Sequence, residues 1–467
     1  MTGKRDFLVG KRVTVIGLGI EGVDVAGYAA AHGATVAVFD SKPPEALAAR
    51  IQQLEGAPIN YVLGRQTTEG IADSDIVFVS QSVPLDSAPV AEARAHGVPI
   101  DSMVRFFMEQ CPGPTIGITG SSGKTTTTSL VAAILAADGR AYRVGGNIGT
   151  GLLGLLDGID ERTWTVMELS HTQLQLIDRG PHIAAVLNVT PNHLDQFTWD
   201  EYVALKQAIV RSQTADDIAV LNFDDEISSA MSALTPATIW HFTLDDELPG
   251  DGALLRDDAV FVRRGNVEEM VLPARDIPLR GQHNVANVLA ATAIAAAAGV
   301  RADVMARAVR AFTPVPHRLE DVAEVAGVRY VNDSIATTPE RALAGIRSFD
   351  EPLVLLLGGK DKDLPKDELA QDALRRCHGI VFFGADGALL EAAVEANAAF
   401  AAPEDRPTTV RVVTLAEAVR DAREMAEPGD VVLLSPACTS FDAYANFEER
   451  GEEFRRIVHE IAAEEGR

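Results

Sequence analysis

The segment GITGSSGKTTTTSL, residues 117–130, has the composition of a phosphate-binding loop. Gly120 and Gly123 let the backbone turn its N–H groups toward phosphate oxygens, and a helix that begins at Lys124 adds the positive end of its dipole. Lys124 supplies a mobile charge for the terminal phosphates, and Thr125 supplies a hydroxyl for Mg²⁺. The spacing is shorter than the common Gly-x4-Gly-Lys-[Ser/Thr]. The strand pattern before it and the helix pattern after it nevertheless predict a nucleotide site.

A second glycine set stands near the N-terminus, as Gly17-Leu-Gly19-Ile-Glu-Gly22, with Asp40 at the end of the next predicted strand. This spacing fits the fingerprint of a dinucleotide-binding turn. Three interpretations stay open at this point: NAD, a nucleotide-sugar diphosphate, or a structural turn that needs glycine only for close packing. We favour a bound nucleotide.

Three further residues could take part in phosphate chemistry. Glu168 ends the apolar run TWTVME, and a carboxylate at a strand end beside a phosphate loop is a natural ligand for magnesium. His193 lies in NVTPNHLDQF, and Lys206 lies on the helix pattern that follows. Each of the three, taken alone, is more simply a solvated or structural side chain. Their occurrence after the phosphate loop makes them candidates.

Polar residues also gather at element boundaries later in the chain. Asn284, Arg318 and Asp333 could meet a base, a phosphate and a ribose. Two more apolar runs end in polar segments that contain Lys362, Ser440 and Asn446, which could form a small polar pocket. Ordinary turn chemistry explains the second group equally well.

The elements that must position these residues alternate between strand and helix patterns, which predicts an α/β fold with parallel sheets. We expect three domains, at 1–112, 113–315 and 316–467, with CPGP at 111–114 as a linker. Residues 253–273 look like a small antiparallel hairpin excursion. A helix is predicted from Gly281, closed by Gly299.

Composition narrows the class of protein. The 467 residues carry a formal net charge of −26, which disfavours nucleic acid as a partner because the surface repels a polyphosphate backbone. Three widely spaced cysteines indicate reduced thiols, and no apolar run approaches the length of a membrane span. These features predict a cytoplasmic protein.

The motifs together resemble those of the Mur ligase family. The segments GITGSSGKTTTTSL, GGNIG, MELS, NVTPNHLDQF, GQHNVAN, PHRLE, NDSIAT, GGKDKD and LSPACTSFDAYANFEERG occur in that family's order and span nearly the whole chain. The short loop Gly-x-x-Gly-Lys-[Ser/Thr] is typical of the family. The resemblance implies a Rossmann-like N-terminal domain that binds a UDP-linked substrate, a central P-loop domain for ATP and Mg²⁺, and a Rossmann-like C-terminal domain that contacts ATP and the amino acid.

The resemblance also implies the reaction. The C-terminal motif and the chain length favour the member that adds glutamate, D-Glu before L-Glu, to UDP-N-acetylmuramoyl-L-alanine through an acyl phosphate and a tetrahedral intermediate. This step belongs to cytoplasmic peptidoglycan precursor synthesis, uses ATP and two Mg²⁺ ions, and has a carbamylated Lys206. The implied partners are small molecules, without nucleic acid or membrane, and the implied state is a monomer. Addition of L-Glu, or another Mur-type amino-acid ligase, is the alternative.

Residue roles follow from the same resemblance. The implied catalytic residues are Lys124, His193 and Lys206. The implied ATP contacts are Gly120, Ser121, Ser122, Gly123, Lys124, Thr125, Thr126, Asn284, Arg318 and Asp333. The implied contacts of the UDP-linked substrate are Gly17, Gly19, Ile20, Glu21, Asp40, Ser41, Lys42, Ser80, Asn147 and Ser170. Thr337, Lys362, Ser440 and Phe447 fall where the family binds glutamate, and Thr125, Glu168, His193 and carbamylated Lys206 fall where it binds metal.

Three segments depart from the family pattern. Ile335 replaces a frequent lysine in NDSKAT, which removes a cation from the glutamate side. The SPG loop of the first domain reads Ser80-Gln81-Ser82, and ELSSFQL reads ELSHTQL, with His171 and Thr172 in the middle.

Two other classes of protein explain less. A nicotinamide dehydrogenase leaves the second nucleotide loop unused. A P-loop switch ATPase leaves the first glycine set and the third domain unused.

Overall fold

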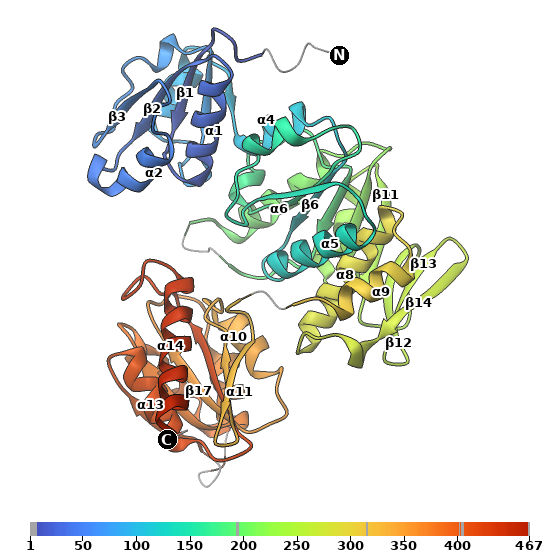
Figure 1. Ribbon diagram of the computed structural model, residues 1–467, viewed down its shortest axis with the longest axis vertical. Helices are drawn as coiled ribbons and strands as arrows, with labels where there is room; N and C mark the ends of the chain where they lie inside the picture. Colours follow the sequence, from blue (N-terminus) through green and yellow to red (C-terminus); the bar gives the residue numbers. More distant parts are fainter. Residues whose placement is uncertain (1–6, 193–195, 314–315, 401, 403–405, 466–467) are drawn as a thin grey trace. The chain divides into compact units, whose positions relative to one another are not determined.

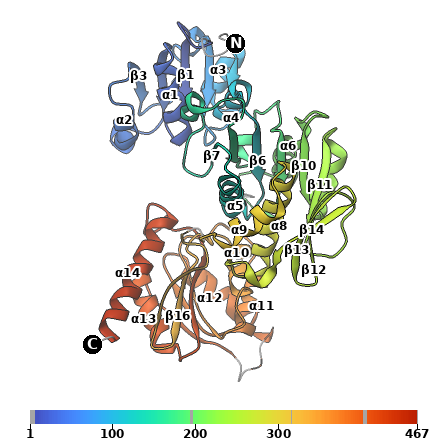
Figure 2. The ribbon, with the colours of Figure 1, turned by 45° about the vertical axis from the view of Figure 1, so that its right-hand side comes forward.

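The computed structural model describes residues 7–192, 196–313, 316–400, 402 and 406–465 (Figures 1 and 2). The chain divides into two compact units. The first comprises Met1–Pro191, Thr198–Ala274 and Asn287–Val309, and the second comprises Asn192–Phe197, Arg275–Ala286 and Arg310–Arg467. The first unit holds two β-sheets and the second unit holds the third. The α/β class predicted from the alternating patterns is confirmed.

The first sheet is parallel throughout, in the order β3-β2-β1-β4-β5. Its strands are β1 (Arg12–Ile16), β2 (Thr35–Asp40), β3 (Ile59–Leu63), β4 (Ile76–Val79) and β5 (Ile100–Asp101). Its helices are α1 (Ile20–Ala31), α2 (Ala48–Gln53), α3 (Ala88–Ala95) and α4 (Met103–Gln110). Strand β1 pairs with both β2 and β4, so the strand order reverses there. In open α/β sheets, ligands bind beyond the carboxyl ends of the strands at this point.

The central sheet has the order β14-β13-β12-β11-β10-β9-β6-β8-β7. Its strands are β6 (Thr115–Thr119), β7 (Tyr142–Gly146), β8 (Trp164–Glu168), β9 (Ile183–Val186), β10 (Ile218–Asn222), β11 (Thr238–Thr243), β12 (Gly252–Arg256), β13 (Ala259–Arg264) and β14 (Val267–Pro273). Only the β12–β13 and β13–β14 pairings are antiparallel, which confirms the excursion predicted over 253–273. The helices of this part are α5 (Lys124–Ala137), α6 (Trp199–Arg211), α7 (Glu226–Ala230), α8 (Gln282–Ala297) and α9 (Ala302–Arg310). Gly299 follows α8 with a φ of +82°, as expected of a glycine that ends a helix.

The third sheet has the order β15-β16-β20-β17-β18-β19, with β15 antiparallel and the other strands parallel. Its strands are β15 (Glu320–Val325), β16 (Val328–Asn332), β17 (Leu353–Gly358), β18 (Cys377–Phe383), β19 (Thr408–Arg411) and β20 (Val431–Ala437). Its helices are α10 (Pro339–Ile346), α11 (Asp367–Arg376), α12 (Gly387–Ala396), α13 (Leu415–Met425) and α14 (Phe447–Glu465). One apolar core lies under α10, α11 and α12, and another under α13 and α14. Both faces of β17 and β20 are therefore covered, which explains their continuous apolar sequences.

Two expectations from composition can be checked against these elements. No helix among the described residues is long and apolar enough to span a bilayer. Cys111, Cys377 and Cys438 are free thiols, as predicted.

Candidate nucleotide-binding and active site

The first glycine set forms the turn between β1 and α1. Gly17 has a φ of +89°, and its N–H donates a hydrogen bond to Phe39 O at 2.8 Å. A Cβ on Gly22 would lie 2.0 Å from Gly17 O, so only glycine lets α1 pack this closely. Asp40 Oδ2 accepts from Leu18 N at 2.7 Å and Oδ1 accepts from Lys42 N at 2.8 Å. Each carboxylate oxygen keeps a lone pair for a ligand hydroxyl.

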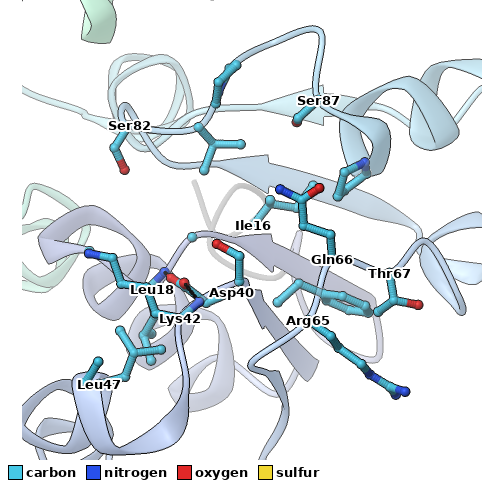
Figure 3. Close-up of a pocket in the computed structure, with 18 of the residues that line it drawn as sticks. Ile16, Leu18, Asp40, Lys42, Leu47, Arg65, Gln66, Thr67, Ser82 and Ser87 are labelled. Carbon is cyan, nitrogen blue, oxygen red and sulfur yellow. Dashed lines mark hydrogen bonds between the residues drawn. The ribbon is translucent and has the colours of Figure 1, made fainter.

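A cavity of about 550 Å³ opens beside this turn (Figure 3). Five predicted contacts of the UDP-linked substrate line it: Gly17, Gly19, Asp40, Ser41 and Lys42. The sequence analysis missed six further polar or charged lining residues: Arg50, Arg65, Gln66, Thr67, Ser82 and Ser87. Arg65, Gln66 and Thr67 follow β3 in a loop that carries no motif, and Ser82 and Ser87 follow β4, where Ser82 ends the segment that departs from the SPG loop. Lys42, Arg50 and Arg65 place positive charge around a cavity in a strongly acidic chain, which suits an anionic ligand.

Five predicted contacts of the UDP-linked substrate do not line this cavity: Ile20, Glu21, Ser80, Asn147 and Ser170. Asn147 Nδ2 donates to Glu168 Oε1 at 2.8 Å, and Ser170 Oγ donates to Gln81 Oε1 at 2.9 Å. Ser80 is buried, and its Oγ donates to Gly17 O at 2.7 Å, so it supports the turn from beneath. Glu21 is also buried: its Oε1 accepts from Gln173 Nε2 at 2.7 Å, and its Oε2 accepts from Gln81 N at 2.8 Å. Burial raises the pKa of Glu21. Ile20 is exposed at the start of α1.

The phosphate loop joins β6 to α5, which begins at Lys124 as predicted. Gly123 has a φ of +79°, and a Cβ there would lie 2.3 Å from Asn287 Oδ1. Lys124 Nζ donates to Gly120 O at 2.7 Å, so the ammonium group folds back over the loop. Ser122 N donates to Asn188 Oδ1 at 2.8 Å. The sequence analysis missed Asn188, which follows β9, the neighbour of β6 in the sheet.

The remaining loop side chains differ in their surroundings. Ser121 Oγ donates to Thr190 O at 2.9 Å and lies 3.0 Å from Tyr202 Oη, so this hydroxyl fastens the loop to the protein. Thr126 is fully buried, and its hydroxyl has no hydrogen-bond partner among the described residues. Thr125 is half-buried at the first turn of α5. Of these three side chains, Thr125 is the best placed to reach a ligand.

Glu168 fits a magnesium ligand. It ends β8 and is paired with Ile118 of β6, directly before the phosphate loop. Only 2% of its surface is exposed, and its Oε1 accepts from Asn147 Nδ2 at 2.8 Å. Its buried Oε2 has no hydrogen-bond partner among the described residues. Such an oxygen is costly to bury unless a cation or donor satisfies it.

The other predicted metal ligands are less complete. Lys206 on α6 is 1% exposed, and its Nζ lies 4.9 Å from the centroid of the Tyr202 ring. Through the Tyr202 hydroxyl, α6 is therefore linked to Ser121 of the phosphate loop. His193 lies outside the described residues. Within the described part of the chain, no group of three His, Cys, Asp or Glu side chains forms a ready metal site.

Among the predicted ATP contacts of the second unit, Asn284 lies on α8, Arg318 precedes β15, and Asp333 directly follows β16. Asp333 Oδ2 accepts from Ser435 Oγ at 2.8 Å, and its Oδ1 accepts from Leu319 N at 3.2 Å. Burial raises the pKa of Asp333 to about 7, although the positive charge of Arg318 acts in the opposite direction and lowers it. The pKa of His283 is lowered to about 4, mainly by burial and also by the positive charge of Arg318. Asn284 Nδ2 donates to Arg280 O at 2.7 Å.

The predicted glutamate contacts lie on turns that follow the carboxyl ends of β16, β17 and β20. Thr337 follows β16, Lys362 follows β17, and Ser440 follows β20. Reciprocal backbone hydrogen bonds of 2.9 Å between positions 360 and 439 join the second turn to the third. Phe447 begins α14, and its carbonyl accepts from Ser334 Oγ at 2.8 Å, which joins α14 to the first turn.

Two residues near these turns have structural roles. Arg450 is fully buried and donates to Ser334 O at 2.8 Å and to Cys438 O at 3.2 Å. It therefore holds two of the turns together, and the sequence analysis missed it. Asn446 Oδ1 accepts from Glu449 N at 2.8 Å and caps the start of α14. This agrees with the simpler of the two interpretations of Asn446.

Comparison with known families assigns all three parts of the chain. Residues 11–102 match the Mur ligase MurD-like N-terminal domain, residues 118–295 match the Mur ligase middle domain, and residues 317–438 match the Mur ligase glutamate ligase domain. The three matches follow one another in the order of the three sheets.

Individual proteins agree with these matches. A UDP-N-acetylmuramoylalanine–D-glutamate ligase of Symbiobacterium thermophilum is 40% identical over 97% of this chain and 98% of its own. One of Koribacter versatilis is 38% identical over 98% of this chain and 99% of its own. Among solved structures, the UDP-N-acetylmuramate–alanine ligase of Thermotoga maritima has a TM-score of 0.59 at 17% identity, covering 96% of this chain and 99% of its own, and shows the fold alone. With all three domains in order and relatives this similar over nearly its full length, the chain belongs to the Mur ligase family.

Proposed function

We propose that this protein is an ATP-dependent ligase that joins D-glutamate to the alanyl carboxyl of UDP-N-acetylmuramoyl-L-alanine, forming ADP and phosphate. The observation that carries the proposal is the full-length identity of 38–40% to ligases named for this reaction. Two separate nucleotide-type turns in the first unit support it, because the reaction needs a uridine nucleotide and ATP at once. A carboxylate is a poor electrophile, so ATP first converts it to an acyl phosphate, which the glutamate amine attacks to give a tetrahedral intermediate.

The cavity of the first sheet, within residues 1–112, would hold the uridine diphosphate. Lys42, Arg50 and Arg65 would offset its charge. The Asp40 carboxylate, held by two backbone N–H groups, would accept from a hydroxyl of the ligand. Gly17 and Gly19 keep the turn free of side chains where the diphosphate approaches the start of α1.

The phosphate loop, within residues 113–315, would hold the triphosphate of ATP. The Lys124 ammonium, now on the Gly120 carbonyl, would move onto the phosphates. The N–H groups at the start of α5 would point at the same oxygens. We also propose Asn284, Arg318 and Asp333 as ATP contacts.

Magnesium would be held near Glu168, whose buried Oε2 has no partner among the described residues, together with Thr125 and His193. We propose two ions and a carbamate on Lys206, whose oxygens would add anionic ligands where the described residues offer no group of three His, Cys, Asp or Glu side chains. Magnesium, when bound, supplies positive charge that neutralises the phosphates.

The turns within 316–467 would bind glutamate. Lys362 would pair with a glutamate carboxylate, Thr337 and Ser440 would supply hydrogen bonds, and Phe447 would supply an apolar wall. Ile335 leaves this site with one cation fewer than many relatives have. Since the substrates are nucleotides, we place the reaction in the cytoplasm, carried out by a monomer.

Phosphate release tests the proposal. The purified protein is given ATP, Mg²⁺ and UDP-N-acetylmuramoyl-L-alanine, with D-glutamate, L-glutamate or neither. We expect release that requires both the uridine substrate and D-glutamate. Release without the uridine substrate would instead indicate a switch ATPase, and faster release with L-glutamate would reverse the stereochemical assignment.

A further inference from the structure

Two of the departures from the family pattern meet in space. Gln81 stands in the loop after β4, between Ser80 beneath the first glycine turn and Ser82 on the cavity wall (Figure 3). Thr172 stands in the turn after β8. The Thr172 hydroxyl donates to Gln81 Oε1 at 3.4 Å, and both residues belong to the first unit. The two changes therefore act together.

The Gln81 side chain is held from two directions. Its Oε1 also accepts from Ser170 Oγ at 2.9 Å. Its backbone N–H donates to Glu21 Oε2 at 2.8 Å, and Gln173 Nε2 holds the other oxygen of Glu21 at 2.7 Å. A carboxamide whose oxygen accepts two hydrogen bonds has a defined orientation, so the direction of its NH₂ group is also defined.

Ser170 has little hydrogen-bonding capacity left for a ligand. Its hydroxyl donates to Gln81, accepts from Gln173 N at 3.2 Å, and lies 3.1 Å from the Thr172 hydroxyl. A hydroxyl has one donor and two acceptor sites, and the Thr172 proton is also given to Gln81, so Ser170 keeps one acceptor site but no donor for a ligand. In contrast, the hydrogen bonds of Gln81 within the described part of the chain use Oε1 and the backbone N–H, and none uses Nε2.

We infer that Gln81 is a substrate-positioning residue, whose Nε2 donates to an oxygen of the sugar-linked segment that leaves the cavity beyond the diphosphate. This rests on the proposed function. The substrate must extend from the cavity to its reacting carboxyl near Glu168. Gln81 lies between the two: it directly precedes Ser82 of the cavity wall in the sequence, and its side chain bonds to Ser170, two residues after Glu168. Ser170 and Thr172 together anchor the oxygen of the carboxamide.

Binding measurements separate this role from a structural one. Calorimetric titration with UMP, UDP and UDP-N-acetylmuramoyl-L-alanine compares the wild type with Gln81→Ala, Thr172→Val and the double variant. Gln53→Ala, at the exposed end of α2, is the matched control. We expect Gln81→Ala to bind the full substrate about 10-fold more weakly and to bind UMP and UDP as the wild type does. The KM for ATP and the melting temperature should not change.

The anchoring by Thr172 has its own readout. Thr172→Val should weaken binding of the full substrate about three-fold, and the double variant should be no weaker than Gln81→Ala alone, because both changes remove one contact. Additive losses would overturn the anchoring. Equal losses for UDP and the full substrate, or no loss for either, would overturn the contact itself while leaving the proposed reaction intact. A wild type that does not bind the full substrate would instead refute the proposed function.

Discussion

The two glycine turns of the first unit share one architecture but present their binding groups differently. In both, a parallel strand ends in glycines and a helix begins within a few residues: β1 leads to α1, and β6 leads to α5. Beside the first turn lies a cavity of about 550 Å³, and its acidic residue Asp40 is fastened to the backbone. At the second turn, the groups that could bind a ligand already have hydrogen-bond partners in the protein: Lys124 Nζ donates to Gly120 O, and Ser122 N donates to Asn188 Oδ1.

The difference indicates that one motif can present its binding groups to a ligand in two ways. The first turn is preorganised, so a ligand needs to displace few protein hydrogen bonds. At the second turn, a triphosphate must displace Gly120 O from the Lys124 ammonium and Asn188 Oδ1 from Ser122 N. Breaking these hydrogen bonds offsets part of the free energy gained when the triphosphate binds. The first turn therefore suits the substrate that stays bound through the reaction, and the second suits the one that is consumed.

The largest expected effect comes from Lys124→Ala. This change removes the only side-chain charge within the loop 120–126 and should lower kcat about 1,000-fold, because charge on the transferring phosphoryl group loses its stabilisation. Binding of the uridine substrate should stay the same, since the first turn is separate. Phosphate release and calorimetric titration measure the two effects. A fall of less than 10-fold in kcat would contradict the role given to Lys124.

The next largest effect is expected from substitution of Gly22 in the first glycine turn. In Gly22→Ala the new Cβ would lie 2.0 Å from Gly17 O, so we expect about 3 kcal/mol of lost stability and at least 100-fold weaker binding of the uridine substrate. Gly19→Ala is the matched control, because no atom lies within 4 Å of its added Cβ and its φ of −77° suits any residue.

The control separates packing from ligand approach. Gly19→Ala should melt like the wild type and weaken only the binding of the diphosphate. Thermal unfolding and titration with UDP distinguish the two variants, and equal melting temperatures for both would show that the close approach of Gly22 to Gly17 O does not hold the turn.

A smaller effect on activity is expected when Glu168, the proposed magnesium ligand, is changed. Glu168→Gln keeps the shape of the side chain and removes its charge, so activity should fall about 100-fold and the Mg²⁺ concentration for half-maximal activity should rise. Glu161→Gln, at an exposed position before β8, is the control. An unchanged magnesium dependence in Glu168→Gln would remove this residue from the metal site.

The smallest effect concerns stability and leaves turnover unchanged. Asp101 of β5 is 6% exposed, and burial raises its pKa from 3.8 to about 7. Between these values the folded protein retains a proton that the unfolded chain releases, so stability falls as pH rises from about 4 through 7. The loss between pH 5 and pH 8 should be about 2 kcal/mol.

The variant Asp101→Asn tests the cause of this pH dependence. It cannot ionise and keeps an oxygen for the hydrogen bond from Ser102 N, so it should lose this part of the pH dependence and unfold at a higher temperature than the wild type at pH 8. Melting curves across this range measure it. Parallel curves for the two proteins would show that Asp101 is not the titrating group.

The parts of the site predicted from the sequence are those with strong local constraints. Gly17, Gly22 and Gly123 occupy positions where a Cβ collides with backbone or a neighbouring side chain, and such positions recur at fixed spacing along the chain. The hairpin at 253–273 and the start of α5 were predicted for the same reason, because turn residues and apolar periodicity are read locally.

The residues that were missed come from distant segments. Arg65 and Gln66 follow β3, Ser82 and Ser87 follow β4, and these segments meet only because both strands lie on either side of the β2–β1 pair. Asn188 reaches the phosphate loop because β9 lies beside β6. Ser80 and Glu21 were predicted as ligand contacts, and their hydrogen bonds instead place them beneath or beside the turn.

The sequence by itself determined where the chain turns tightly between a strand and a helix, the order of the three α/β segments and the family to which they point. Glycine positions, strand ends and helix starts are fixed by steric constraints between near neighbours, and these leave a readable pattern. Only the tertiary structure decided which polar groups line the cavity, which are used to hold the turns, and that Gln81 meets Thr172. The lining of the cavity depends on strand order within the first sheet, and the contact of Gln81 with Thr172 joins segments that follow strands of two different sheets, so residues far apart in the chain meet.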